Sequence, residues 1–104
     1  GLATPDHHFL EIQAAADGRT VGFVWFAKMQ RGPSMAAFIY QIHVDAEARR
    51  QGHALAALRA VEAFARTERL SAVALHVFQH NAAALALYRA AGYAVASLNL
   101  HKLL

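Results

Sequence analysis

The spacing of apolar residues changes near residue 50, and this change constrains the fold more than any other feature. Before it, apolar residues alternate with polar ones or gather in short runs rich in Val, Phe, Ile and Trp, which is typical of strands. After it, Leu55, Leu58, Val61 and Ala65 recur at helical spacing. Alternation returns at Val73. The pattern therefore predicts a sheet covered by helices.

Turn and capping residues divide this pattern into elements in the order β-β-β-α-β-α-β. Asp17-Gly18-Arg19 and the segment 31–34 are typical of turns, Asn81 of a helix N-cap, and Gly92 of a helix end. The predicted strands cover 8–14, 20–30, 36–44, 71–78 and 93–103. The predicted helices cover 51–69 and 82–91. We expect an α/β (α+β) fold with a mixed, mostly antiparallel sheet and two covering helices.

Composition restricts the functional classes. The 104 residues are 57% hydrophobic and 16% charged, without a composition break, so we expect a single domain over 1–104. The net charge of +3 is spread along the chain, and we expect no nucleic-acid partner. The absence of cysteine excludes a disulfide scaffold, a thiolate zinc site and a cysteine nucleophile.

Neither a membrane span nor a metal site is expected. No apolar run approaches the ~20 residues of a membrane helix, and residues 1–6 do not resemble a signal peptide, which favours a cytoplasmic location. His76 and His80 would lie ~13 Å apart along an extended strand, too far for one ion. His7 and His8 would point to opposite faces of a strand.

The segment 44–55 is the most informative stretch for function. A strand ends, a loop with Arg49 and Arg50 follows, and a helix begins directly after Gly52. The first amides of a helix lack intrahelical partners, so this end suits an anion such as a pyrophosphate. Gly52 and the small Ala54 leave those amides open. The alternative is an ordinary helix start with a tolerated glycine and two solvated arginines.

A second segment supports the anion site. Arg49-x-x-Gly52-x-Ala54 is followed, after one helix and one strand, by Asn81-x-x-Ala84-x-x-Leu87-Tyr88-x-x-x-Gly92-Tyr93. The pair resembles the GNAT superfamily of acetyl-CoA-dependent N-acetyltransferases, which carries R/Q-x-x-G-x-G/A at its pyrophosphate loop and N-x-x-A-x-x-L-Y-x-x-x-G-F/Y downstream. The resemblance runs from about residue 20 onward, and 75–81 and 97–102 look like a bacterial subgroup. The family's usual first strand and two helices have no counterpart here, so we expect an N-terminally short domain.

The resemblance implies an acetyl-CoA site between splayed strands, here 38–44 and 73–78. The pantetheine arm would pair with the backbone of the first strand, and the pyrophosphate would lie on the amides at the helix start. Asn81 would contact the arm, while its alternative role is an N-cap. The implied acetyl-CoA-binding residues are Ile42, His43, Val44, Arg49, Arg50, Gln51, Gly52, His53, Ala54, Asn81, Ala84 and Tyr88.

The implied reaction is direct attack of an amine on the thioester, without a covalent enzyme intermediate. Tyr88 matches the family's general acid, which protonates the leaving thiolate; its alternative role is a core aromatic with one wet end. Gln41 and His43 stand where relatives tend to carry carboxylates, and Gln41 cannot act as a base. His43 is the first candidate base and His80 the second, with a relayed water as the third solution.

Three functions remain open from the sequence. The first is an N-acetyltransferase that transfers an acetyl group from acetyl-CoA to a primary amine. The second is a CoA-binding regulatory or catalytically weak domain, favoured by Gln41 and His43. The third is an interaction module that uses the fold as a scaffold. The strand 8–14 would be an open edge beside an uncovered sheet face, so we expect a homodimer or a piece of a longer protein.

Overall fold

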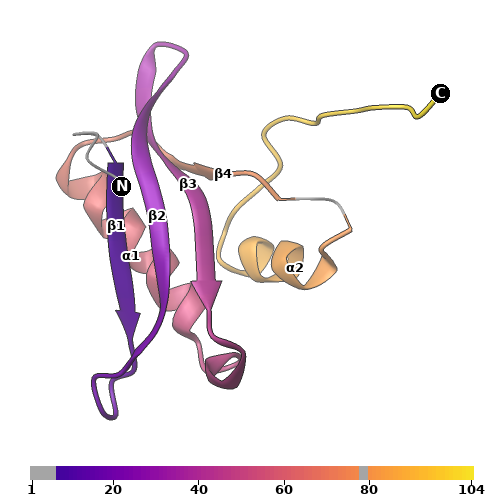
Figure 1. Ribbon diagram of the computed structural model, residues 1–104. Helices are drawn as coiled ribbons and strands as arrows, with labels where there is room; N and C mark the ends of the chain where they lie inside the picture. The colour runs from indigo at the N-terminus through magenta and orange to yellow at the C-terminus, as the bar shows by residue number, and fades with distance from the viewer. Residues whose placement is uncertain (1–6, 78–79) are drawn as a thin grey trace.

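The computed structural model describes residues 7–77 and 80–104 and contains a four-stranded sheet in the order β1-β2-β3-β4 (Figure 1). The strands are β1 (His7–Gln13), β2 (Thr20–Arg31), β3 (Ser34–Val44) and β4 (Val73–Leu75). The helices are the short 3-10 helix η1 (Ala46–Ala48), α1 (His53–Thr67) and α2 (Ala82–Ala90). β1 to β3 pair antiparallel, and β4 pairs parallel with β3. The expected mixed, mostly antiparallel sheet with two helices is confirmed.

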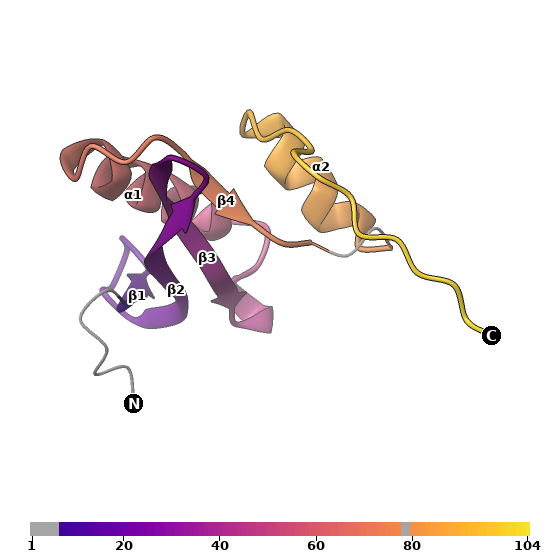
Figure 2. The same cartoon turned by 90° about the horizontal axis from the view of Figure 1, so that it is seen from above.

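The core lies between one face of the sheet and α1 (Figure 2). Val24 and Phe26 of β2 and Leu58 and Val61 of α1 are at most 1% exposed. The helical spacing of the apolar residues therefore predicted the buried face of α1 correctly from Leu58 onward. Leu55 is exposed, because it lies in the first turn, before the helix meets the sheet.

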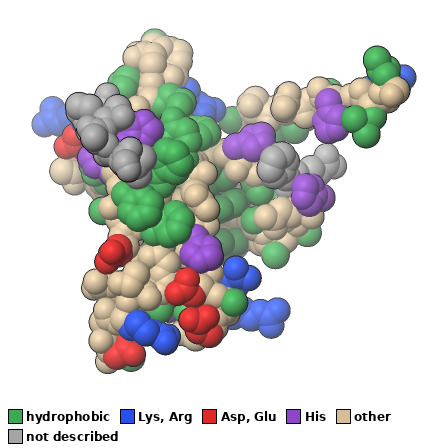
Figure 3. Space-filling model, viewed as in Figure 1, with side chains coloured by type: hydrophobic (Ala, Val, Ile, Leu, Met, Phe, Trp, Pro, Cys, Tyr) green, Lys and Arg blue, Asp and Glu red, His purple; other side chains and the backbone are tan. Residues whose placement is uncertain are grey.

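The opposite face of the sheet carries stacked aromatic side chains that the described residues leave partly exposed (Figure 3). Phe9 stacks on Phe23, and Trp25 stacks on Tyr40, each at a ring-centroid distance of 4.8 Å. His7 joins this face, where its Nδ1 accepts a hydrogen bond from Trp25 Nε1. The next residue of β1 packs on the α1 face, so adjacent histidines point to opposite faces as predicted.

The last part of the chain differs from the prediction. β4 spans only 73–75 instead of 71–78, whose final residue, Phe78, lies outside the described residues. The predicted strand 93–103 is wrong: residues 94–104 are exposed and leave the sheet (Figure 1). A strand needs a paired backbone, and the short β4 offers little edge for it. α2 lies beside β4 with no buried residue, so in the described chain only α1 covers the sheet.

Candidate functional site

β3 and β4 separate soon after they pair. Their parallel register runs from Ala37 opposite Val73 to Ile39 opposite Leu75, where β4 ends, while β3 continues to Val44. The β2–β3 register shifts at the same place, which leaves Tyr40 as an extra residue in β3. Such a bulge bends its strand and often lies next to a functional site. The backbone of β3 after Ile39 therefore has no partner from β4.

A pocket of about 360 Å³ occupies the space where the two strands diverge. It is lined by β3, the end of β4 with the segment that follows it, and α2 with its N-cap. The lining residues are Ile39, Tyr40, Gln41, Ile42, Leu75, His76, Val77, Asn81, Ala84 and Tyr88. Four residues assigned to acetyl-CoA binding from the sequence are therefore brought together here, namely Ile42, Asn81, Ala84 and Tyr88.

Tyr88 lines the pocket from the α2 side. Its side chain extends from α2, is half-buried, and meets the ring of Tyr93 edge-on at 6.2 Å. Burial raises the pKa of the Tyr88 hydroxyl above its ordinary value. The hydroxyl is therefore protonated at neutral pH, which is the form that can donate a proton.

Asn81 begins α2 at the mouth of the same pocket. Its Oδ1 accepts a hydrogen bond from the backbone N–H of Ala84 at 3.2 Å, so the predicted N-cap is confirmed. His80 precedes it, is exposed, and is not among the residues that line the pocket. The cap fixes the start of the helix that carries Tyr88.

The loop between β3 and α1 forms an open helix N-terminus. Gly52 is its N-cap, with φ of 81°, and no side chain caps the helix. A Cβ built on Gly52 would meet no heavy atom within 4 Å. The first turn of α1 contains no acidic residue, and the amides of His53 and Ala54 have no acceptor within the helix. The helix dipole adds partial positive charge, so this end suits a phosphate group.

Two arginines of this loop can contact an anion, and the loop also carries two carboxylates. Arg49 and Arg50 are both exposed, and Arg49 Nε donates to the carbonyl of Val44 at 3.0 Å, which ties the loop to the end of β3. Arg50 adopts a φ of 64°, which a non-glycine residue rarely takes. His53 Nε2 is buried and has no hydrogen-bond partner within the described ranges.

His43 lies apart from the pocket. Its Nε2 lies 3.1 Å from Asp45 Oδ1, its ring packs near Phe23, and it does not line the space around Tyr88. The structure therefore does not bring together the two residues to which the sequence assigned catalysis. The carboxylate of Asp45, two residues along the same segment, was the signal that His43 would have a local partner.

Two further findings concern the described chain as a whole. In residues 7–77 and 80–104, no group of three or more His, Cys, Asp or Glu side chains could hold a metal ion. No helix in this part of the chain is long and apolar enough to cross a membrane.

Relatives agree with this architecture. Two proteins of Bacillus subtilis (strain 168) are similar in sequence: the uncharacterized N-acetyltransferase YycN, 34% identical over 93 residues, and the uncharacterized N-acetyltransferase YdgE, 33% identical over 102 residues. The matches include 89% and 98% of this chain, and the chain spans 59% and 64% of those relatives.

Solved structures and a family match give the same assignment. The crystal structure of YycN superposes with a TM-score of 0.85 at 33% identity, over 100% of this chain and 66% of that one. An acetyl transferase structure from Pyrococcus furiosus, described as putative by its authors, has a TM-score of 0.85 at 27% identity, over 99% and 69%. Residues 2–93 match the acetyltransferase (GNAT) family. Because this match covers most of the sequence, the chain belongs to the GNAT family of acetyltransferases.

Proposed function

We propose that this chain is an N-acetyltransferase that transfers an acetyl group from acetyl-CoA to a primary amine. The observation that carries the proposal is the pocket between β3 and the segment after β4, which has the protonated phenol of Tyr88 on its wall. The open N-terminus of α1 lies at the end of the loop that leaves β3. A long, thin donor with an anionic end matches this combination of narrow pocket and helix terminus.

The chain's residues hold the donor in three places. The edge of β3 that faces away from β2, at Ile42, His43 and Val44, pairs with the amides of the pantetheine arm, as an added strand would. Asn81 and Ala84 bound the arm from the α2 side. The amides of 51–54, with the charges of Arg49 and Arg50, hold the pyrophosphate.

Acetyl-CoA supplies a thioester whose carbonyl carbon an amine attacks directly, so that a C–N bond forms and the C–S bond breaks. Tyr88 donates its hydroxyl proton to the leaving sulfur. The chain orients the thioester beside this hydroxyl. Among the described residues that line the pocket none is a carboxylate, so we assign the removal of the amine proton to a relayed water.

A second function is favoured by one observation. Gln41 lines the pocket and cannot accept a proton as a base, and His43 is held by Asp45 outside it. A CoA-binding domain with weak or no transfer activity would have this arrangement. The two functions differ in turnover and not in donor affinity.

The test removes the hydroxyl group of Tyr88 and keeps its aromatic ring. We expect Tyr88→Phe to lower kcat about 100-fold or more and to change CoA affinity little, because only the proton donor is lost. Tyr40→Phe is the matched control, since Tyr40 lines the same pocket, and its kcat should equal that of the unaltered chain. Equal activity of Tyr88→Phe would remove the catalytic role, and an unaltered chain that binds CoA without turnover would favour the second function.

We also propose that two copies of this chain pair through the aromatic face of the sheet. Phe9 is 49% exposed and Tyr40 is 41% exposed on that face. Contiguous exposed apolar surface usually marks an interaction site. Light scattering at micromolar concentration should give the mass of a dimer, and a clean monomer would contradict the pairing.

A further inference from the structure

α2 carries Asn81 and Tyr88, yet little apolar packing holds it in place. None of its residues is fully buried, and in the views of Figures 1 and 2 it lies beside the sheet and not against a face. Tyr88 packs against the edge of the core, and its position also depends on what connects the end of α2 to the rest of the protein. That connection is made to α1.

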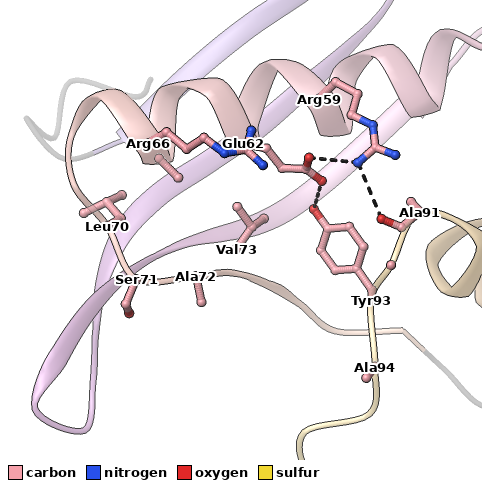
Figure 4. A pocket seen from close by; sticks show the side chains of 12 residues that line it. Arg59, Glu62, Arg66, Leu70, Ser71, Ala72, Val73, Ala91, Tyr93 and Ala94 are labelled. Atoms are coloured by element: carbon pink, nitrogen blue, oxygen red, sulfur yellow. Dashed lines mark hydrogen bonds and ion pairs between the residues drawn. The ribbon is translucent and has the colours of Figure 1, made fainter.

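Three polar side chains and one carbonyl form this connection (Figure 4). The Tyr93 hydroxyl donates to Glu62 Oε2 at 2.9 Å, and Arg59 Nη1 donates to Glu62 Oε1 at 2.9 Å. Arg59 Nη1 also lies 3.5 Å from the carbonyl oxygen of Ala91, the residue that ends α2. Figure 4 shows Arg59 and Glu62 extending from α1 and Tyr93 meeting them from the segment after α2. Side chains 31 residues apart in sequence are thereby joined.

The surroundings strengthen these bonds. The Glu62 side chain is only 13% exposed. Its carboxylate accepts hydrogen bonds on both oxygens, which satisfies a nearly buried charge. The guanidinium of Arg59 also lies at the C-terminal end of α2, where a helix dipole favours a positive charge.

Tyr93 connects this network to the pocket. Its ring meets the ring of Tyr88 edge-on at 6.2 Å, and its backbone N–H donates to the carbonyl of Tyr88 at 2.9 Å. A change that frees the Tyr93 side chain therefore also affects Tyr88, which lines the pocket.

We infer that Arg59, Glu62 and Tyr93 form a polar tether that positions α2, and that Glu62 is a positioning residue for Tyr88. The role of the tether in catalysis rests on the proposed function. The tether itself does not, because its effect on α2 is measurable without any ligand.

The experiment measures backbone hydrogen exchange of residues 82–90 in the whole chain without ligand. We expect Glu62→Ala and Tyr93→Phe each to speed this exchange about 10-fold, because each removes a hydrogen bond to a charged, nearly buried group. Tyr93→Phe keeps the packing of the aromatic ring, so faster exchange in this variant reports the lost hydrogen bond and not a general loss of folding. Exchange in Glu62→Gln should be slower than in Glu62→Ala, because the amide oxygen of the new side chain still accepts a hydrogen bond from Tyr93.

Glu68→Ala is the matched control, because Glu68 follows the same helix and pairs with Lys28 of β2 instead of with α2. Its α2 exchange should match the unaltered chain. Exchange that stays unchanged in both Glu62→Ala and Tyr93→Phe would overturn the tether.

Measurements of kcat and of nucleotide affinity then distinguish the tether from the proposed function. In Glu62→Ala, kcat should fall about 10-fold while the affinity for adenosine diphosphate, which probes only the α1 end, stays the same. Unchanged kcat alongside faster exchange would overturn the positioning role of Glu62. An unaltered chain that binds no CoA, alongside faster exchange in the variants, would support the tether and count against the proposed function.

Discussion

Adding a side chain at Gly52 separates the cost of backbone strain from the loss of the anion site. Gly52 has a φ of 81°, and a Cβ there would meet no protein atom within 4 Å. Gly52→Ala should therefore destabilise the fold only through its left-handed backbone, by about 1–2 kcal/mol. The new methyl group would lie at the open amides where a phosphate approaches.

The expected loss of CoA affinity in Gly52→Ala is larger than the backbone strain at Gly52 explains. Displacing a phosphate from its N–H donors removes hydrogen bonds to a charged group, about 1.5–3 kcal/mol. The dissociation constant for CoA should therefore rise roughly 10- to 100-fold. Gly52→Leu, with a larger side chain, should abolish measurable binding.

Gly18 provides the matched control. It has a φ of 72° in the β1–β2 turn and also has nothing within 4 Å of a built Cβ. Gly18→Ala should lose the same stability in urea denaturation but keep its CoA affinity in calorimetric titration. Equal CoA affinity for Gly52→Ala and Gly18→Ala would refute the assignment of the α1 N-terminus to the pyrophosphate.

Two further predictions concern stability. Gly22→Ala should cost about 3 kcal/mol in urea denaturation, because its Cβ would lie 2.0 Å from the carbonyl oxygen of His43; a loss below about 1 kcal/mol would contradict that close approach. Burial alone would raise the pKa of Glu62, but hydrogen bonds from Arg59 and Tyr93 outweigh it and hold the pKa below its ordinary 4.5. This contribution to stability is present above pH 4.5 and is lost as the pH falls through the lowered value, so Glu62→Gln should flatten the acid side of the stability–pH curve.

Local patterns were enough to predict the first three strands and α1. The alternation in β2 and the 3.6-residue spacing of Leu58 and Val61 are patterns among residues close in sequence. Each pattern arises because one face of the element is buried against a neighbouring element. Asn81 was recognisable as a cap because its oxygen bonds only three residues away.

The remaining features depend on contacts between distant segments. The 93–103 stretch is apolar enough for a strand, but strand formation depends on a partner edge that the sequence of the stretch does not encode. The network of Glu62 could not be predicted, because no local window of the sequence contains both of its partners, Arg59 and Tyr93. His43 was chosen as a base for its residue type, and the bond to Asp45 shows why residue type alone was insufficient.

Calorimetric titration of this chain with acetyl-CoA, CoA and adenosine diphosphate tests the central claim most directly. The diverging strands and the open start of α1 form one continuous donor site in this account. Acetyl-CoA and CoA should therefore bind with micromolar affinity, and adenosine diphosphate, which lacks the pantetheine arm, should bind far more weakly. Equal affinity for all three would contradict the pocket between β3 and α2 as the site of the arm, and no binding of any would contradict the donor site as a whole.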